Sequence, residues 1–155
     1  MATTKYGKYV ISKPKVVEQL ASHLKETAYQ WKQPAEIYLD GEILPGCPVW
    51  FDINWIWDTH LPKEASWIRP HEHDQNEVLL FIATNPEGDL GGEIEISIGK
   101  GRNAEKHTFN HTTAIYMPAG LTHCPIVYKS FDKSKPQMMM ALLFNPKYVT
   151  SESGK

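Results

Sequence analysis

The sequence is poor in cysteine and in long apolar runs, and each shortage excludes a class of protein. Only two cysteines, Cys47 and Cys124, occur in 155 residues, whereas small disulfide-built secreted domains use four or more in a shorter chain. We therefore expect reduced thiols. No apolar stretch approaches the roughly 20 residues that a membrane helix requires, and the first ten residues lack the apolar core of a signal peptide. The pattern favours a cytoplasmic protein with no membrane contact.

An excess of either charge is also missing. Sixteen Lys and Arg stand against eighteen Asp and Glu, which leaves a formal net charge of -2. Proteins that bind nucleic acid usually present a strongly basic surface, so we expect no nucleic-acid partner and instead a small-molecule ligand. The length and the 41% hydrophobic content suffice for one domain with a real core.

The beginning of the chain has the apolar period of a helix. Within residues 13–29 the apolar side chains fall on one helical face, and these are Val16, Val17, Leu20 and Leu24. Ser12 is a candidate N-cap, and Pro14 stands in the first turn. We therefore expect one short amphipathic helix here.

After Pro34 the pattern changes to short β-prone stretches separated by turn residues. About eight strands are expected, at Glu36–Leu39, Val49–Asp58, Ala65–His73, Glu77–Ala83, Glu93–Ile98, Ala114–Met117, Cys124–Lys129 and Met138–Phe144. Their number and spacing suit an all-β barrel or sandwich. The predicted organisation is an N-terminal strand and helix in residues 1–34, a single barrel domain in 35–148 and a disordered tail in 149–155.

Two separate segments carry side chains suited to metal ligation. His71 and His73 stand two residues apart, and Glu77 follows four residues later. In an extended strand, residues i and i+2 point to the same face, and the following turn returns Glu77 beside them. A Pro-x-Gly turn at 118–120 then delivers His123 at the start of another strand. Imidazoles with one carboxylate suit one divalent transition metal, namely Fe, Mn, Zn, Ni, Co or Cu, and leave positions open for water or substrate.

Together, His-x-His-x3-Glu and Pro-x-Gly-x2-His resemble the two signature motifs of the cupin superfamily. The resemblance covers roughly residues 50–145. It implies an all-β, cupin-type jelly-roll β-barrel in which His71, His73, Glu77 and His123 bind one metal ion. The glycine and asparagine residues that usually flank these motifs are replaced here. The replacements leave every ligand position filled but point to no particular subfamily.

Two residues near the expected ligands are candidates for substrate binding. Alternation places Arg69 on the metal-facing side of its strand, where it could clamp an anion or pair with an acidic neighbour at the barrel mouth. Phe81 shares the face of Glu77 and would either line an apolar cavity or pack in the core.

The aromatic stretch before them offers two more candidates. The apolar face of this strand is expected to turn toward the core, and it carries Phe51, Ile53, Trp55 and Trp57. Asp52 and Asn54 lie on the other face. Between aromatic neighbours they would also suit the wall of a pocket that grips a polar or aromatic ligand.

The resemblance implies a metalloenzyme that acts on a small organic carboxylate, carbonyl or aromatic substrate. It leaves oxygenase, isomerase, decarboxylase and lyase chemistry open, with Glu77 as the candidate catalytic base. The alternative is a non-catalytic barrel that binds or senses a small ligand or the metal itself. A homodimer is expected, because residues 1–12, with Tyr6 and Tyr9, could add a strand to an open sheet edge of a neighbouring subunit.

Overall fold

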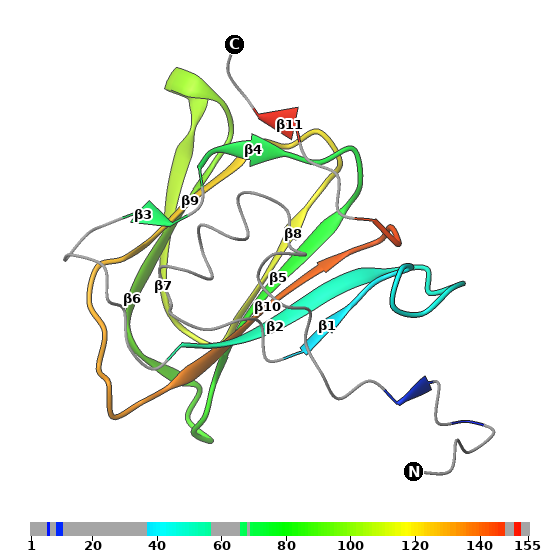
Figure 1. Ribbon diagram of the computed structural model, residues 1–155. Coiled ribbons are helices and arrows are strands. Elements are labelled where there is room, and N and C mark those ends of the chain that lie inside the picture. The colour runs from blue at the N-terminus through cyan, green and yellow to red at the C-terminus, as the bar shows by residue number, and fades with distance from the viewer. Residues whose placement is uncertain are drawn as a thin grey trace.

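The computed structural model describes residues 37–56, 66–67, 69–147 and 151–152, together with Tyr6, Tyr9 and Val10. Almost all regular structure in these residues is β-strand, arranged in two antiparallel sheets (Figure 1). The helix predicted at 13–29 lies outside the described residues. Within the described part of the chain, no helix is long and apolar enough to cross a membrane.

The first sheet, called sheet A here, has five strands. In spatial order they are β1 (Ile37–Leu39), β2 (Trp50–Ile56), β10 (Gln137–Leu143), β5 (Glu77–Ala83) and β8 (Thr113–Met117). Buried and partly exposed side chains alternate along β2, β5 and β10. The alternation means that one face of sheet A is turned toward the core.

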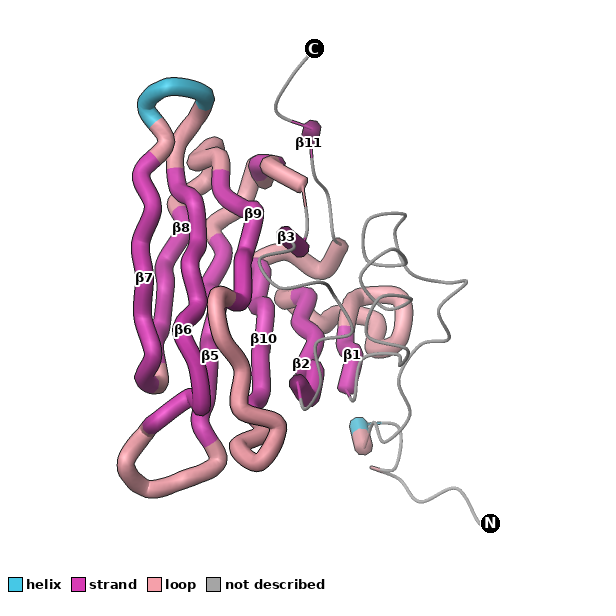
Figure 2. Tube along the Cα trace, turned by 90° about the vertical axis from the view of Figure 1, so that its left-hand side faces the viewer, coloured by secondary structure: helices cyan, strands magenta, loops and turns pink. Residues whose placement is uncertain are grey.

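The second sheet, sheet B, packs against that face. Its spatial order is β11 (Ser151–Glu152), β4 (His71–Glu72), β9 (His123–Tyr128), β6 (Asp89–Ile98) and β7 (Glu105–His111), and β3 (Ser66–Trp67) also pairs with β9. Figure 2 shows the strands of the two sheets running along one another in successive layers. This is a jelly-roll arrangement of two packed sheets.

Side chains from both sheets meet in a shared core. Phe81 of sheet A and Phe109 of sheet B pack edge to face with their ring centroids 5.0 Å apart. Leu90, Ile94 and Ile96 of β6 are fully buried. The core therefore fills the space between the sheets and makes them one unit.

The predicted orientation of β2 was wrong. The buried face carries Trp50, Asp52, Asn54 and Ile56, whereas Phe51, Ile53 and Trp55 are only partly buried; Trp57 lies outside the described residues. Pairing with β10 decides the orientation. Asp52 stands opposite Ala141, and Asn54 stands opposite Met139. Both partners are buried, and residues directly opposite in an antiparallel pair share a face.

Other strands also differ from the prediction, because of a proline residue and because of pairing between strands. The strand predicted at 65–73 is divided into β3 and β4 around Pro70, which lacks the N–H needed for a continuous ladder. The strand β7 was not predicted, since nearly all its side chains are exposed and show no apolar alternation. Within the predicted tail, Ser151 and Glu152 pair with β4. Near the N-terminus, the Tyr9 N–H donates to the Tyr6 carbonyl in a turn.

Candidate metal centre

The site begins with a pair of histidines placed by the register of two strands. His71 of β4 lies directly opposite His123 of β9. Their ring centroids are 4.4 Å apart, at an interplanar angle of 60°. His71 comes 52 positions before His123, so only the pairing of β4 with β9 brings the two rings together.

The two motifs are also joined by their turns. Gly120 donates its backbone N–H to the carbonyl of His73 at 2.7 Å, and Ala119 donates to Asn76 Oδ1 at 3.0 Å. Gly120 has φ +76°, in the left-handed region that glycine enters without steric cost. The Pro-x-Gly turn thus holds the first motif beside the second.

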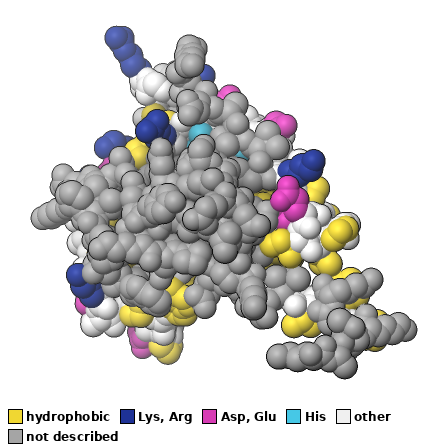
Figure 3. All heavy atoms as spheres, viewed as in Figure 1, with side chains coloured by type: hydrophobic (Ala, Val, Ile, Leu, Met, Phe, Trp, Pro, Cys, Tyr) yellow, Lys and Arg dark blue, Asp and Glu magenta, His cyan; other side chains and the backbone are white. Residues whose placement is uncertain are grey.

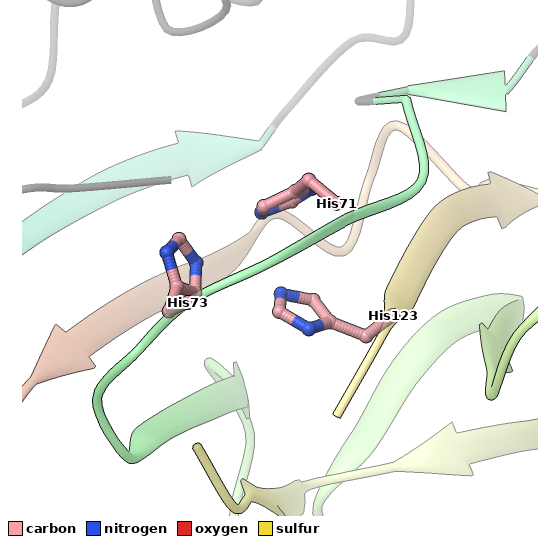
Figure 4. Close-up of side chains that lie close together, drawn as sticks. All are labelled: His71, His73 and His123. Carbon is pink, nitrogen blue, oxygen red and sulfur yellow. The ribbon is translucent and has the colours of Figure 1, made fainter. Parts of the chain in front are cut away.

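Three imidazoles converge on one point inside the fold. Their ligand atoms all lie within 4.8 Å of one another, and Figure 4 shows the rings of His71, His73 and His123 turned toward a common centre. Their exposed fractions are 7%, 3% and 1%. Such a buried cluster of three imidazoles can hold one divalent metal ion.

The hydrogen bonds of two rings select the nitrogen that faces this centre. His71 donates Nδ1–H to the carbonyl of Arg69 at 2.8 Å, and His123 donates Nδ1–H to the carbonyl of Leu121 at 3.0 Å. Because a carbonyl only accepts, each Nδ1 carries the proton. Each Nε2 therefore keeps a lone pair for a metal, in the arrangement usual for ligating histidines.

Glu77 is the fourth group at this centre, with an exposed fraction of 3%. Its Oε2 lies 2.9 Å from His123 Nε2 and 3.6 Å from His73 Nε2. Among the residues that the structure describes, none donates a hydrogen bond to Oε2. Neighbouring ligands of an ion with bonds near 2.1 Å lie about 3 Å apart, so a cation at the centre would satisfy this oxygen. The donor set fits one divalent transition metal.

The protonation states of the imidazoles agree with that fit. Burial, with the charge of His123 as the next cause, lowers the pKa of His71 to about 4. Burial would also lower the pKa of His123, but the adjacent Glu77 carboxylate outweighs it, so that pKa is raised. A divalent cation would take the place of the proton that His123 and Glu77 attract.

The residues predicted to bind substrate lie in three different environments. Phe81 is fully buried and packs on Phe109. Asp52 and Asn54 are buried on the inner face of sheet A. The Arg69 side chain is exposed, and its backbone carbonyl is the part that reaches the site.

Two features around the site were missed by sequence reasoning, a row of buried side chains and a hydrogen bond. Trp50 and Met117 lie in the same inward row as Glu77, because Glu77 pairs with Met117 on one side and with Leu143, itself opposite Trp50, on the other. Thr122, just before β9, donates its hydroxyl to Glu72 Oε2 of β4 at 2.8 Å and so links the segments that carry His71 and His123. No sequence pattern signals either, because both depend on register.

The buried thiol beside the site is not part of it. Cys124 follows His123 and is 3% exposed. Burial, together with the charge of Glu77, raises its pKa well above the ordinary range for a thiol. Cys124 is therefore a neutral, packed side chain, and both cysteines of the chain are free.

A jelly roll of two sheets with the histidines of both motifs gathered between them has the cupin fold. No family model matches the sequence, and no curated protein sequence matches it significantly. Solved structures do match. A variant of Bacillus subtilis oxalate decarboxylase superposes with a TM-score of 0.50 at 12% identity, over 74% of this chain and 26% of that one.

Two further structures resemble the chain. Oxalate oxidase in complex with glycolate gives a TM-score of 0.48 at 14% identity, over 75% of this chain and 53% of that one. Vicilin from Corylus avellana (hazelnut) gives 0.43 at 15% identity, over 64% and 24%. The chain thus spans about half or less of the length of each. At 12% identity the likeness to the Bacillus subtilis enzyme shows the fold alone.

Proposed function

We propose that this protein is a metal-dependent cupin enzyme that holds one divalent transition metal through His71, His73, His123 and Glu77. The observation that carries the proposal is the convergence of three buried imidazoles from two distant segments. Two of them already have their Nε2 atoms directed to the centre by backbone hydrogen bonds. A surface histidine cluster formed by chance would not be buried and oriented in this way.

The chemistry proposed is the activation of a small organic substrate bound by an oxygen atom. A divalent metal held here would act as a Lewis acid on a carbonyl, carboxylate or enolate oxygen. The protein itself supplies a buried, water-poor setting and the negative charge of Glu77, which is also the candidate to accept a proton. Phe81 would contribute an apolar wall and Arg69 an exposed cation for an anionic substrate.

Metal content and turnover of matched variants test this proposal. Protein from its native host should contain about one metal per chain by elemental analysis, and His71→Ala should contain almost none. His107→Ala changes an exposed histidine of β7 and should keep the metal. Oxalate, the substrate named for the Bacillus subtilis enzyme, is the first of the small carboxylates to assay, with and without oxygen. Full activity in metal-free His71→Ala would exclude the proposal, whereas ligand binding without turnover would favour the non-catalytic alternative.

We further propose a cytoplasmic homodimer of these jelly-roll domains. In the described part of the chain, β7 and β8 each end a sheet, and an open edge is the usual place for a neighbouring subunit to pair. On the face seen in Figure 3, described Lys and Arg side chains and described Asp and Glu side chains both lie around the rim. Sedimentation at micromolar concentration tests the dimer, and fractionation of native cells tests the location.

A further inference from the structure

A second carboxylate lies inside the fold, on the inner face of sheet A. Asp52 has an exposed fraction of 7%, and so does its neighbour on the same face, Asn54. Buried carboxylates are costly unless every oxygen has a partner. From the residues that the structure describes, Asp52 Oδ1 accepts no hydrogen bond.

Asp40 shows what a structural buried aspartate looks like in the same chain. Asp40 is 4% exposed, and its Oδ1 accepts the backbone N–H groups of Glu42 and Ile43 at 3.0 and 2.9 Å. Those bonds close a turn at the surface end of β1 and account for its burial. No comparable account exists for Oδ1 of Asp52, which stands in the middle of a strand.

The register places Asp52 within reach of a ligand on the metal. Asp52, Ala141 and Leu79 form one inward row across sheet A, and the adjacent row contains Glu77. Two strand spacings and one step of two residues separate the backbones of Asp52 and Glu77, about 12 Å in all. Both side chains are buried on the inner face of sheet A, so a molecule of a few carbon atoms bound at the metal would extend toward Asp52.

We propose that Asp52, supported by Asn54, forms a second subsite that accepts a hydrogen bond from a hydroxyl or amine at the far end of a metal-bound substrate. The inference rests on the function proposed above and adds a substrate class to it. The substrate has an oxygen-bearing group at one end for the metal and a hydrogen-bond donor a few carbons away.

The charges of the site favour a donor over an acceptor at this position. Burial raises the pKa of Asp52 to about 7, although hydrogen bonds from the Asn54 side chain and the Ala141 backbone oppose the shift. A divalent cation nearby would favour the ionised form. An ionised carboxylate can only accept hydrogen bonds. A substrate hydroxyl or ammonium would therefore complete its hydrogen bonding, and a substrate carbonyl would be repelled.

A series of hydroxamates that differ only in the group at the far end of the chain, called the tip here, tests this subsite. Their binding to the cobalt-loaded protein is measured at pH 8. The hydroxamate end binds cobalt, and the other end of a two-, three- or four-carbon chain carries methyl, methoxy, hydroxyl or ammonium. Calorimetry and the visible cobalt spectrum give the dissociation constants. At one chain length or more, we expect hydroxyl or ammonium tips to bind about tenfold more tightly than methyl tips, as a hydrogen bond to a charged group provides. Methoxy tips, which cannot donate, should bind like methyl tips.

Variants then identify the group that accepts the bond. Asp52→Asn and Asp52→Ala should lose the preference and keep the cobalt stoichiometry and the affinity for methyl-tipped hydroxamate. Glu93→Gln makes the same carboxylate-to-amide change at an exposed position and should retain the preference.

Each outcome is decisive. A wild-type protein that binds every tip equally overturns the subsite, even if the Asp52 variants fail to fold, and so does a preference that survives in both variants. Failure of the wild-type protein to bind cobalt overturns the proposed metal function and the subsite with it. Normal cobalt binding without a tip preference overturns the subsite alone.

Discussion

His71 and His123 stand opposite each other in the pairing of β4 with β9, with their Nδ1–H groups bonded to backbone carbonyls two residues earlier in the chain, at Arg69 and Leu121. Each ring is thus oriented by its own strand, while their separation is set by the pairing between strands. The backbone alone prepares two Nε2 atoms for one cation, and this arrangement leads to the following predictions.

Replacing one of these rings should abolish tight metal binding. His123→Ala removes a buried imidazole of the proposed metal site and leaves Glu77 without its neighbour at 2.9 Å. We expect metal affinity to fall by at least about 100-fold, more than the loss of a supporting hydrogen bond would cause. Competition with a coloured chelator measures it. His111→Ala, an exposed histidine on β7, is the control, and equal affinity in the two variants would contradict the site.

Removing only the charge of Glu77 should weaken metal binding without abolishing it. Glu77→Gln keeps the shape of the side chain, and the three imidazoles, whose ligand atoms lie within 4.8 Å of one another, remain. We expect one metal per chain at saturation and an affinity lower by about 10- to 100-fold. The same titration measures both quantities. An unchanged affinity would show that Glu77 is not a ligand.

The link behind the ligands should contribute to stability. Thr122 is 4% exposed and donates to Glu72 at 2.8 Å. Thr122→Val removes the hydroxyl and leaves the Glu72 carboxylate without this donor, at a cost of about 1 to 2 kcal/mol in unfolding free energy. Denaturant unfolding measures the change. Thr108→Val, at an exposed position of β7, should change stability by less than about 0.5 kcal/mol, and equal effects would refute the role of the link.

Asp52 should make the metal-free protein less stable as the pH rises. Its pKa of about 7 in the folded protein lies above its ordinary value of 3.8, so the folded state holds a proton that the unfolded state releases. Unfolding free energy therefore falls between about pH 4 and pH 7 by about 3 to 4 kcal/mol from this group. Asp52→Asn should lack this decline and be the more stable protein at pH 8. Urea unfolding across this range checks it, with Glu93→Gln expected to follow the wild type; parallel curves for all three would reject the assignment.

Much of the site could be predicted from local sequence. The ligand candidates were found because imidazoles at i and i+2 share a strand face, and because a Pro-x-Gly turn predicts a change of direction just before His123. The strand Glu77–Ala83 was predicted with the bounds that the structure has. After Glu77 it is a short continuous run of apolar residues followed by a turn at Asn85-Pro86, a local property that needs no partner to be recognised.

Other features could not be predicted, because each depends on pairing between strands that are distant in the sequence. Both faces of β2 carry large apolar side chains, so composition favoured the wrong one, and pairing with β10 turned Asp52 inward. Strand β7 has no apolar alternation and exists as a strand through its pairing with β6. Neither the row of Trp50 and Met117 beside Glu77 nor the link between Thr122 and Glu72 has a sequence signal.

By itself, the sequence determined the β-rich class, the ligand types and the strands and turns that carry them, because alternation and turn chemistry act over a few residues. Tertiary structure decided the register that places His71 directly opposite His123 and the register that turns Asp52 to the same interior. Those relationships depend on the registers between distant strands. A shift of one residue in any of them would turn the side chains to the opposite face.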